Sequence, residues 1–277
     1  MTSNSIIKIG DNELDEIIIL INDYSGYDFS DYSKQSLQRR VQRYIDVNKI
    51  SDFKQLLQDL INDSAMVNNL IEELTVNVTE IFRDPSFFAS IRNELVSQLN
   101  KLPVIKIWHA GCSTGEEVYS MAILLKEYNL LDKSIIYATD INQTVLDVAK
   151  SGKYNLDSFK ENENNYRESG GNKNLSDYYT VLNGEVLMND ELKSKIIFST
   201  HNLVSDNAFN QFDLIICRNV LIYFNKSLQD KVLQLFYNSL TKKGMLAIGS
   251  KETLLFSPIE SKMQVINAKW KTWKKKV

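Results

Sequence analysis

The sequence has few of the residues that build metal sites, disulfide frameworks and membrane spans. Its 277 residues include two cysteines, two histidines and three prolines. Two cysteines cannot form a disulfide framework, and two histidines give no metal-ligand cluster. No apolar run approaches the roughly 20 residues that a membrane-spanning helix needs, and the first residues lack a signal-peptide pattern. We therefore expect a cytoplasmic protein without a metal and without direct membrane insertion.

The sequence also lacks a strong excess of charge of either sign. The formal net charge is −3, and 24% of the residues are charged. This balance gives no reason to expect nucleic acid or an anionic membrane as the partner, so any basic docking surface must be local. The length suffices for one or two domains with a sizeable core. Cys112 and Cys217 adjoin apolar runs and are expected to be small buried thiols, and His109 is expected to be a strand-end residue near a pocket.

The most informative stretch is VIKIWHAGCSTGEEVY, residues 104–119. Its apolar start predicts a buried strand, and Gly111 and Gly115 predict a tight turn from which a helix begins. The spacing lacks the lysine of a phosphate-binding loop and the third glycine of a dinucleotide fingerprint. Glu116 and Glu117 would repel a polyphosphate at the helix start. The loop favours a nucleoside such as S-adenosylmethionine (SAM); the alternative is a structural turn with two helix-start carboxylates.

The residues before this stretch have the periodicity of amphipathic helices. Apolar residues spaced by three and four predict three helices, at 14–21, 37–48 and 53–61. We interpret this part as a small helical domain. On the second helix, Arg39, Arg40 and Arg43 project opposite the apolar stripe and form one exposed strip. The strip is either a solvated face or a docking site for an acidic helical surface, because arginine forks suit carboxylates.

Residues 66–88 connect the helical part to a strand-rich part. Alternation over 76–79 predicts an extended segment with one polar face. Arg83 follows next to Asp84, and from these residues alone it reads as a surface ion-pair partner of that aspartate.

Strands and helices alternate from residue 104 onward, which predicts an α/β domain with a mostly parallel sheet. The expected strands are at 104–108, 135–139, 195–199, 212–217 and 245–249. The expected helices are at 117–128, 144–151 and 228–240. In such folds ligands bind at the carboxyl ends of the strands. Asp140 ends the second strand, so it is a candidate for the ribose hydroxyls, with a helix N-cap as the alternative.

Residues 152–194 interrupt this alternation. The segment is polar and rich in asparagine, and Asn183-Gly184 lies between β-branched and aromatic residues, which is a hairpin signal. We expect a small β insertion, with a plain surface excursion as the alternative. Near the end, 263–274 predicts a final strand with Ala268 and Trp270 facing inward, and 274–276 a solvated lysine tail.

Four stretches together resemble the CheR family of bacterial chemotaxis receptor methyltransferases, which are SAM-dependent protein-glutamate O-methyltransferases. In chain order they are NVTEIFRDPSFF, AGCSTGEEVYS, ATDINQTVLDVAKSGKY and FDLIICRNVLIYFNKSLQDKVLQLFYNSL. The resemblance implies a small all-α N-terminal domain, a class I SAM-methyltransferase (Rossmann-like) domain and a small inserted β-subdomain. The implied bounds are 1–75 for the helical domain, 76–100 for a linker contributing to the cofactor site, 101–277 for the methyltransferase domain and about 152–194 for the insertion.

The resemblance also implies the reaction and its residues. A methyl group passes from SAM to receptor glutamates, leaving S-adenosylhomocysteine, and the partners are the cytoplasmic helices of chemoreceptors. Cofactor contacts fall on Asn77, Thr79, Arg83, Glu117, Asp140, Asn202, Leu203, Asn219 and Val220. Catalytic positions beside the methyl group and the substrate carboxylate fall on Arg83, Arg218 and Tyr223. The strip of Arg39, Arg40 and Arg43 falls where the family's N-terminal domain meets the receptor. We expect a monomer that binds no nucleic acid.

Three departures from the family pattern and two other functions accompany this interpretation. Val118 replaces a usual proline. Gly249-Ser250-Lys251-Glu252 stands where a Gly-His-Ser-Glu-like sequence is common, so no role is assigned to Lys251. The inserted β region is not a close match, so binding of a receptor C-terminal tether peptide is not expected from the resemblance. A methyltransferase acting on another protein or a small carboxylic acid is one alternative, and a SAM-sensing module without turnover is the other. A glutamate with a reference pKa of about 4.3 is ionised near neutrality, so the reaction needs no strong base.

Overall fold

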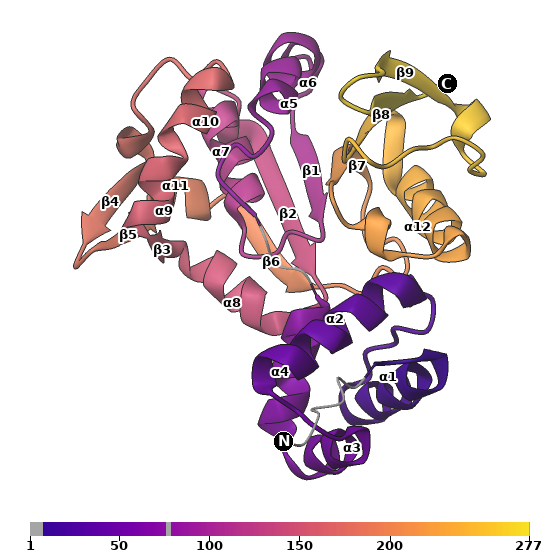
Figure 1. Cartoon of the computed structure of the whole chain (residues 1–277). Coiled ribbons are helices and arrows are strands. Elements are labelled where there is room, and N and C mark those ends of the chain that lie inside the picture. Colours follow the sequence, from indigo (N-terminus) through magenta and orange to yellow (C-terminus); the bar gives the residue numbers. More distant parts are fainter. Residues whose placement is uncertain (1–7, 76–78, 277) are drawn as a thin grey trace. The chain divides into compact units, whose positions relative to one another are not determined.

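A computed structural model describes residues 8–75 and 79–276, and the chain divides into two units. The helical unit comprises Met1–Asn77 together with Tyr223–Gln229, and the larger unit comprises Val78–Ile222 and Asp230–Val277. Each unit has its own apolar core. Figure 1 shows the helices of the first unit and the mixed sheet of the second. In the part of the chain that the model describes, no helix combines the length and apolar character of a membrane span.

Residues 8–75 of the helical unit form four helices with a shared core. They are α1 (Asp11–Ser25), α2 (Lys34–Asn48), α3 (Phe53–Asn62) and α4 (Ser64–Leu74). The apolar stripes of α1 and α2 are buried, as their spacing predicts. In α3, Leu56 and Leu60 are buried, but Ile61, which the spacing placed on the same stripe, is exposed. The fourth helix, α4, covers the start of the segment 66–88 that was expected to connect the two parts of the chain. Asp63 ends α3 and caps α4 by accepting from the N–H of Ala65 at 2.8 Å.

A seven-stranded sheet forms the centre of the larger unit. Its strands are β1 (Ile105–Ala110), β2 (Ser134–Asp140), β6 (Ile196–Thr200), β7 (Phe212–Cys217), β8 (Leu240–Ile248), β9 (Met263–Asn267) and β10 (Thr272–Lys275). The order is β6-β2-β1-β7-β8-β10-β9, and the first five strands are parallel. The chain runs outward from β1 to β6 and then returns to place β7 on the other side of β1. The order therefore reverses between β1 and β7, where α/β folds bind ligands.

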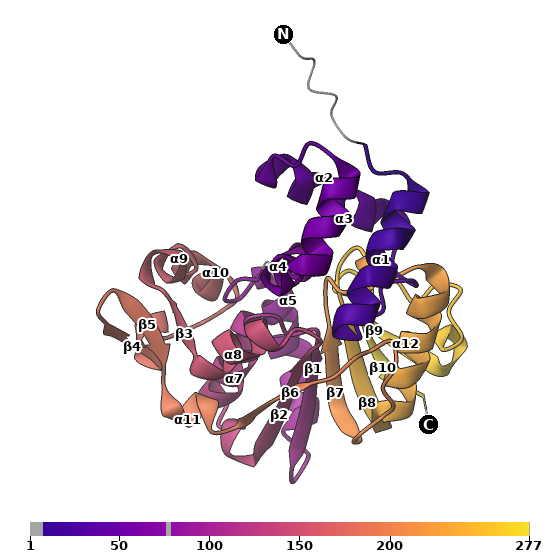
Figure 2. The same cartoon turned by 90° about the horizontal axis from the view of Figure 1, so that it is seen from below.

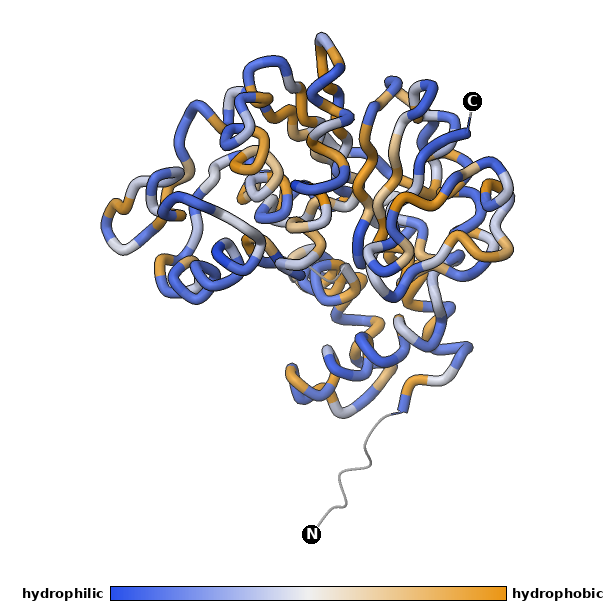
Figure 3. Tube along the Cα trace, turned by 90° about the horizontal axis from the view of Figure 1, so that it is seen from above, coloured by the Kyte–Doolittle hydropathy of each residue, from blue (hydrophilic) through white to orange (hydrophobic). Residues whose placement is uncertain are grey.

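Helices cover this sheet and connect its strands. The main ones are α7 (Glu116–Glu127), α8 (Gln143–Ser151) and α12 (Lys226–Ser239). Shorter elements are α5 (Pro85–Ser90), η1 (Ile91–Leu95), α6 (Val96–Leu99), η2 (Leu131–Lys133), η4 (Leu221–Tyr223) and η5 (Glu260–Lys262). Contacts join α7 to β2 and α8 to both β2 and β6. Figure 2 shows the parallel strands side by side, and in Figure 3 the hydrophobic residues gather along them. The expected α/β fold is confirmed.

A small antiparallel sheet is inserted after α8, as expected for the β-subdomain. Its strands β3 (Lys153–Asn155), β4 (Tyr179–Leu182) and β5 (Glu185–Met188) pair in the order β3-β5-β4. Its helices are α9 (Leu156–Glu161), α10 (Glu163–Glu168), η3 (Leu175–Tyr178) and α11 (Asp190–Lys193). Asn183 and Gly184 have φ angles of 52° and 81° in the β4–β5 turn. Two residues with positive φ are what a tight hairpin turn of this length requires.

A buried network around Glu127 joins this insertion and η1 to the end of α7. The guanidinium of Arg92 contacts the carboxylate of Glu127, and their side chains are 6% and 3% exposed. The hydroxyls of Tyr166 and Tyr178 also donate to Glu127 Oε1, the second at 3.2 Å. Burial and the Glu127 carboxylate raise the pKa of Tyr166 to about 12. Tyr166 and Tyr178 thus hold the insertion to α7 through a network of buried side chains.

The C-terminal segment differs from its prediction. Residues 263–274 form two antiparallel strands, β9 and β10, in place of one. Asn267 Oδ1 accepts from the N–H of Trp270 at 2.9 Å, and Lys271 has a φ of 51°, so the chain turns between them. Ala268 is exposed and Trp270 is half-buried. The lysine tail is wrong too, because Lys275 lies in β10 and donates to two main-chain carbonyls.

We predict that Glu127→Gln lowers the free energy of unfolding by about 3 kcal/mol, because it leaves the Arg92 charge buried without a counter-charge. Urea denaturation followed by circular dichroism measures the change. Glu163→Gln is the matched control, because Glu163 pairs with an exposed Arg167 one helical turn away. Such pairs contribute about 0.5 kcal/mol. Equal effects of the two substitutions would contradict the importance of the buried network.

Candidate functional site

The glycine loop between β1 and α7 is held tightly at the carboxyl edge of the sheet. The N–H groups of Gly111 and Cys112 donate to the carbonyl of Thr139 at 2.8 and 2.9 Å. Gly111 and Gly115 have φ angles of +74° and +91°, which favour glycine. A Cβ on Gly111 would overlap Cγ2 of Val220, which belongs to the loop after β7. Glycine is therefore needed where the two loops of the switch point meet.

Asp140, at the end of β2, faces this glycine loop. Its Oδ2 accepts from the N–H of Ser113 at 2.8 Å, and its Oδ1 accepts from the N–H of Asn142 at 3.0 Å. Asn142, and not Asp140, caps α8, since its side chain accepts from Thr144 N. Burial raises the pKa of Asp140, and the two N–H donors oppose that rise. Asp140 is half-buried, and a third backbone hydrogen bond, with Ile141, also opposes the rise of its pKa.

Glu117 and Arg218 form a buried ion pair across the switch point. Arg218 Nη1 lies 2.9 Å from Glu117 Oε2, and Arg218 Nη2 contacts the carboxylate of Asp84. The Arg218 side chain is 2% exposed, and its guanidinium lies 3.9 Å from the centre of the Phe87 ring. Burial by itself would raise the pKa of Glu117, but the hydrogen bond from His109 and the charge of Arg218 hold it below its usual value. Glu117 is therefore an anion that keeps Arg218 in place.

Glu252 holds the loop after β7 from beneath, a role that sequence reasoning missed. Its buried carboxylate accepts from the N–H of Val220 at 3.0 Å and from the N–H of Gly249. Burial raises its pKa, and these backbone donors lower it. A glutamate directly after an exposed Lys251 gives no local sign of such a role. The position near the end of a strand was the one available signal.

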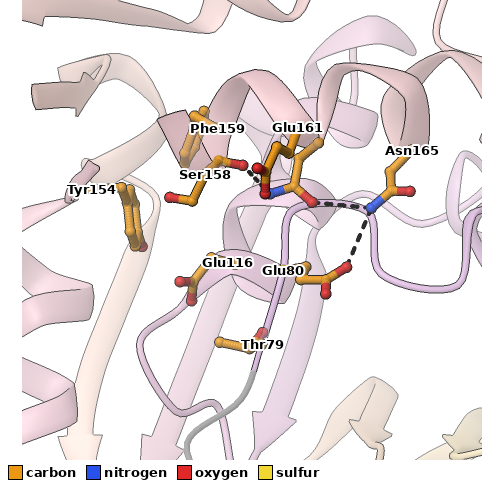
Figure 4. Close-up of a pocket in the computed structure, with 9 residues that line it drawn as sticks. Thr79, Glu80, Glu116, Tyr154, Ser158, Phe159, Glu161 and Asn165 are labelled. Atoms are coloured by element: carbon orange, nitrogen blue, oxygen red, sulfur yellow. Dashed lines mark hydrogen bonds between the residues drawn. The ribbon is translucent and has the colours of Figure 1, made fainter. Parts of the chain in front are cut away.

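A pocket of about 330 Å³ lies between the start of α7 and the β-subdomain. Its lining comprises Thr79, Glu80, Glu116, Tyr154, Ser158, Phe159, Glu161, Asn162 and Asn165, most of them labelled in Figure 4. Burial raises the pKa of Glu116 to about 7, although Thr114 donates to its carboxylate. Of the predicted cofactor contacts, the pocket includes Thr79. Glu116 is consequently a pocket residue and not only a helix-start charge.

The other predicted cofactor residues lie at several places. Asn77 is outside the described residues. Arg83 is half-buried in the turn before α5. Asn202 and Leu203 follow β6, and Asn202 Oδ1 accepts from Val204 N at 2.9 Å. Asn219 follows Arg218 and has a φ of 63°. In the larger unit, the loops after β1, β2, β6 and β7 thus carry most of the predicted contacts to one edge of the sheet.

The arginine strip and Tyr223 belong to the helical unit. Arg39 and Arg43 are exposed on α2, but Arg40 is half-buried, which corrects the prediction of three exposed guanidinium groups. Arg40 Nη1 donates to the carbonyl of Glu73 at 3.3 Å, and its guanidinium lies 5.0 Å from the centre of the Tyr223 ring. Burial lowers the pKa of Arg40. Helical projection places Arg40 on the face opposite the apolar stripe of α2. It cannot show that Tyr223, from a distant segment of the chain, covers Arg40.

The residues at the carboxyl edge fit SAM. The glycine loop brings backbone close to the loop after β7, and no lysine occurs in it to hold a phosphate chain. Asp140 ends β2 at this edge, where an acidic residue can accept a hydrogen bond from a ribose hydroxyl. The buried hydroxyl of Ser113 has no hydrogen-bond partner among the described residues, so a polar group of a ligand would satisfy it.

Family models and known proteins match most of this chain. The model described as CheR methyltransferase, all-alpha domain, matches residues 12–75, and that described as CheR methyltransferase, SAM binding domain, matches 77–272. Putative methyltransferase Cher3 of Pseudomonas putida is 46% identical over 239 residues, 86% of this chain and 88% of that protein. The chemotaxis protein methyltransferase of Listeria innocua is 30% identical over 245 residues, 87% of this chain and 90% of that protein.

A solved structure is similar at lower identity. The N-methyltransferase NodS from Bradyrhizobium japonicum, in complex with S-adenosylhomocysteine, has a TM-score of 0.35 and 13% identity. The match covers 61% of this chain and 62% of that one. A likeness this distant supports no conclusion about this chain. Conclusions about its family rest on the family models and on the similar sequences.

We predict that Gly111→Ala weakens S-adenosylhomocysteine binding at least tenfold, because the new methyl group pushes the loop after β7 away from the glycine loop. Isothermal titration calorimetry measures the dissociation constant. Gly184→Ala is the matched control: its φ is +81°, but a Cβ there meets nothing within 4 Å. If both substitutions leave the affinity unchanged, the close approach is not needed for binding.

Proposed function

The chain belongs to the CheR methyltransferase family, and from this premise we propose that it methylates glutamate side chains of chemoreceptors. The family makes it a SAM-dependent methyltransferase. The proposal adds the acceptor, a glutamate carboxylate, and the product, a glutamate methyl ester. The observation that carries it is the buried guanidinium of Arg218 at the switch point, because a fixed guanidinium suits recognition of a carboxylate. SAM, when bound, supplies an electrophilic methyl group on a sulfonium.

The chain's own residues position the two reactants. Asp140 takes the ribose hydroxyls, and the glycine loop takes the adjoining part of the nucleoside. Arg218, with Arg83, orients the acceptor carboxylate toward the methyl group. Alignment of two bound reactants supplies several kcal/mol of the barrier reduction. The acceptor is already ionised near neutrality, so no side chain has to remove a proton.

The ion pairs of Arg218 limit how strongly it binds the acceptor. Glu117 holds one guanidinium nitrogen, and Asp84, whose side chain is 41% exposed, holds the other. The acceptor carboxylate exchanges with Asp84 at Nη2, while Glu117 stays in place. A guanidinium that is already paired orients the acceptor without neutralising it fully, which preserves its nucleophilicity. Tyr223 is proposed to contact the acceptor through its hydroxyl, and Asn77, Thr79, Asn202, Leu203, Asn219 and Val220 to complete the cofactor site.

The proposal predicts base-labile methyl groups on receptor glutamates. Radiolabelled SAM and membranes containing an overproduced chemoreceptor are incubated with the protein, and volatile label is counted after alkali treatment. Arg218→Gln should lower kcat about 100-fold, because the acceptor loses its orienting group. Alkali-stable label would show a different acceptor chemistry, and absence of label despite S-adenosylhomocysteine binding would sink the receptor assignment.

Receptor docking is proposed for the α2 strip, with Arg39 and Arg43 as its exposed members and Arg40 at its half-buried edge. The combined substitution Arg39→Glu and Arg43→Glu should raise KM for receptor membranes about tenfold and leave kcat unchanged. Added salt should reduce the difference, since exposed charges are screened. Lys54→Glu, a charge reversal on the exposed face of α3, is the control. Equal KM values for both variants would place docking elsewhere.

A further inference from the structure

His109 has a specific polar partner. It is the penultimate residue of β1 and is 1% exposed. Its Nδ1 lies 3.2 Å from Oε1 of Glu117, the second residue of α7. The other ring nitrogen, Nε2, is buried and has no hydrogen-bond partner among the described residues. The nitrogen of this buried imidazole that has a hydrogen-bond partner, Nδ1, thus points at the Glu117 carboxylate.

Glu117 contacts both His109 and Arg218. Its two oxygens have different partners, His109 at Oε1 and Arg218 Nη1 at Oε2, the latter at 2.9 Å. Arg218 Nη2 in turn contacts Asp84. The four side chains thus form a chain of polar contacts from His109 in β1, through Glu117 and Arg218, to Asp84. Asp84, Glu117 and Arg218 are far apart in the sequence, so these contacts exist only in the folded domain.

A hydrogen bond from His109 matters to the Glu117–Arg218 ion pair because the carboxylate of a glutamate can rotate. The last torsion of a glutamate side chain is broad, so one partner alone leaves the oxygens free to rotate. A second hydrogen bond on the opposite oxygen fixes the plane of the carboxylate. The Arg218 fork then has a fixed plane to which it aligns, since guanidinium pairing is directional.

We propose that His109 is a positioning residue for methyl transfer, which holds Glu117 so that Arg218 keeps the orientation it needs toward the acceptor carboxylate. The inference rests on the proposed role of Arg218. His109 itself touches neither the methyl donor nor the acceptor. It acts through Glu117, in the way that second partners of active-site groups fix the geometry of the first.

Two substitutions at His109 separate positioning from simple packing. Asn places an amide nitrogen near Nδ1 and keeps a donor toward Glu117, whereas Leu keeps an apolar volume and removes the donor. We expect kcat for receptor methylation to fall about tenfold in His109→Leu and to stay within twofold in His109→Asn, with KM for receptor membranes unchanged in both. Thr272→Val, a buried polar-to-apolar change in β10, controls for general disturbance of the sheet.

The same substitution in an Arg218→Gln background tests the route of the effect. If His109 acts through Arg218, His109→Leu lowers kcat no further there, because coupled residues are not additive. Equal losses in both backgrounds, or wild-type kcat for His109→Leu, would overturn the inference. If His109→Leu does not fold, as judged by thermal melting, a tenfold loss in a folded His109→Asn would also overturn it.

These measurements distinguish failure of the inference about His109 from failure of the proposed function. Full kcat in Arg218→Gln alone removes the proposed role of Arg218, whatever His109 does. A strong loss in Arg218→Gln together with wild-type kcat in His109→Leu removes only the role of His109.

Discussion

The charge of Arg218 is almost completely withdrawn from water, and much of the site is arranged to keep it paired. Breaking a buried ion pair costs about 3–5 kcal/mol, because the remaining charge is left without compensation. Glu117, Asp84 and the face of Phe87 supply that compensation from three different segments. Contact between the start of α7, the start of α5 and the loop after β7 therefore stabilises the folded domain. The same contacts set the geometry that we propose for methyl transfer.

The strand order makes this convergence possible. Because β7 pairs with the opposite side of β1 from β2, the loops after β1 and β7 leave the sheet side by side. Gly111 allows them to touch, and Glu252 holds the second loop through its backbone N–H groups. The site thus has backbone on two sides and a buried carboxylate beneath it.

The local sequence pattern predicted much of the fold. It failed where contacts with distant residues determine the structure of a segment. The helices of the first unit and the Asn183-Gly184 hairpin follow from periodicity and turn chemistry, which act within a few residues. The final strand was wrong because alternation looks the same in one long strand and in two short ones joined by a turn. The tail was wrong because Lys275 meets carbonyls of Tyr237 and Leu240, about 35 residues earlier. A charged residue at a chain end looks solvated until its partners are known.

The sequence by itself determined the family, the order of the elements, the glycine loop and the acid that ends the second strand, since these depend on motifs and short spacings. Only the tertiary structure decided which of the named residues are exposed and which contact one another. It separated Arg40, half-buried against Tyr223, from the exposed Arg39 and Arg43. It also joined His109 to Glu117 and Glu117 to Arg218, which lies 101 residues away. Pairings over such separations leave no periodic trace, because they arise from the path of the chain through the sheet.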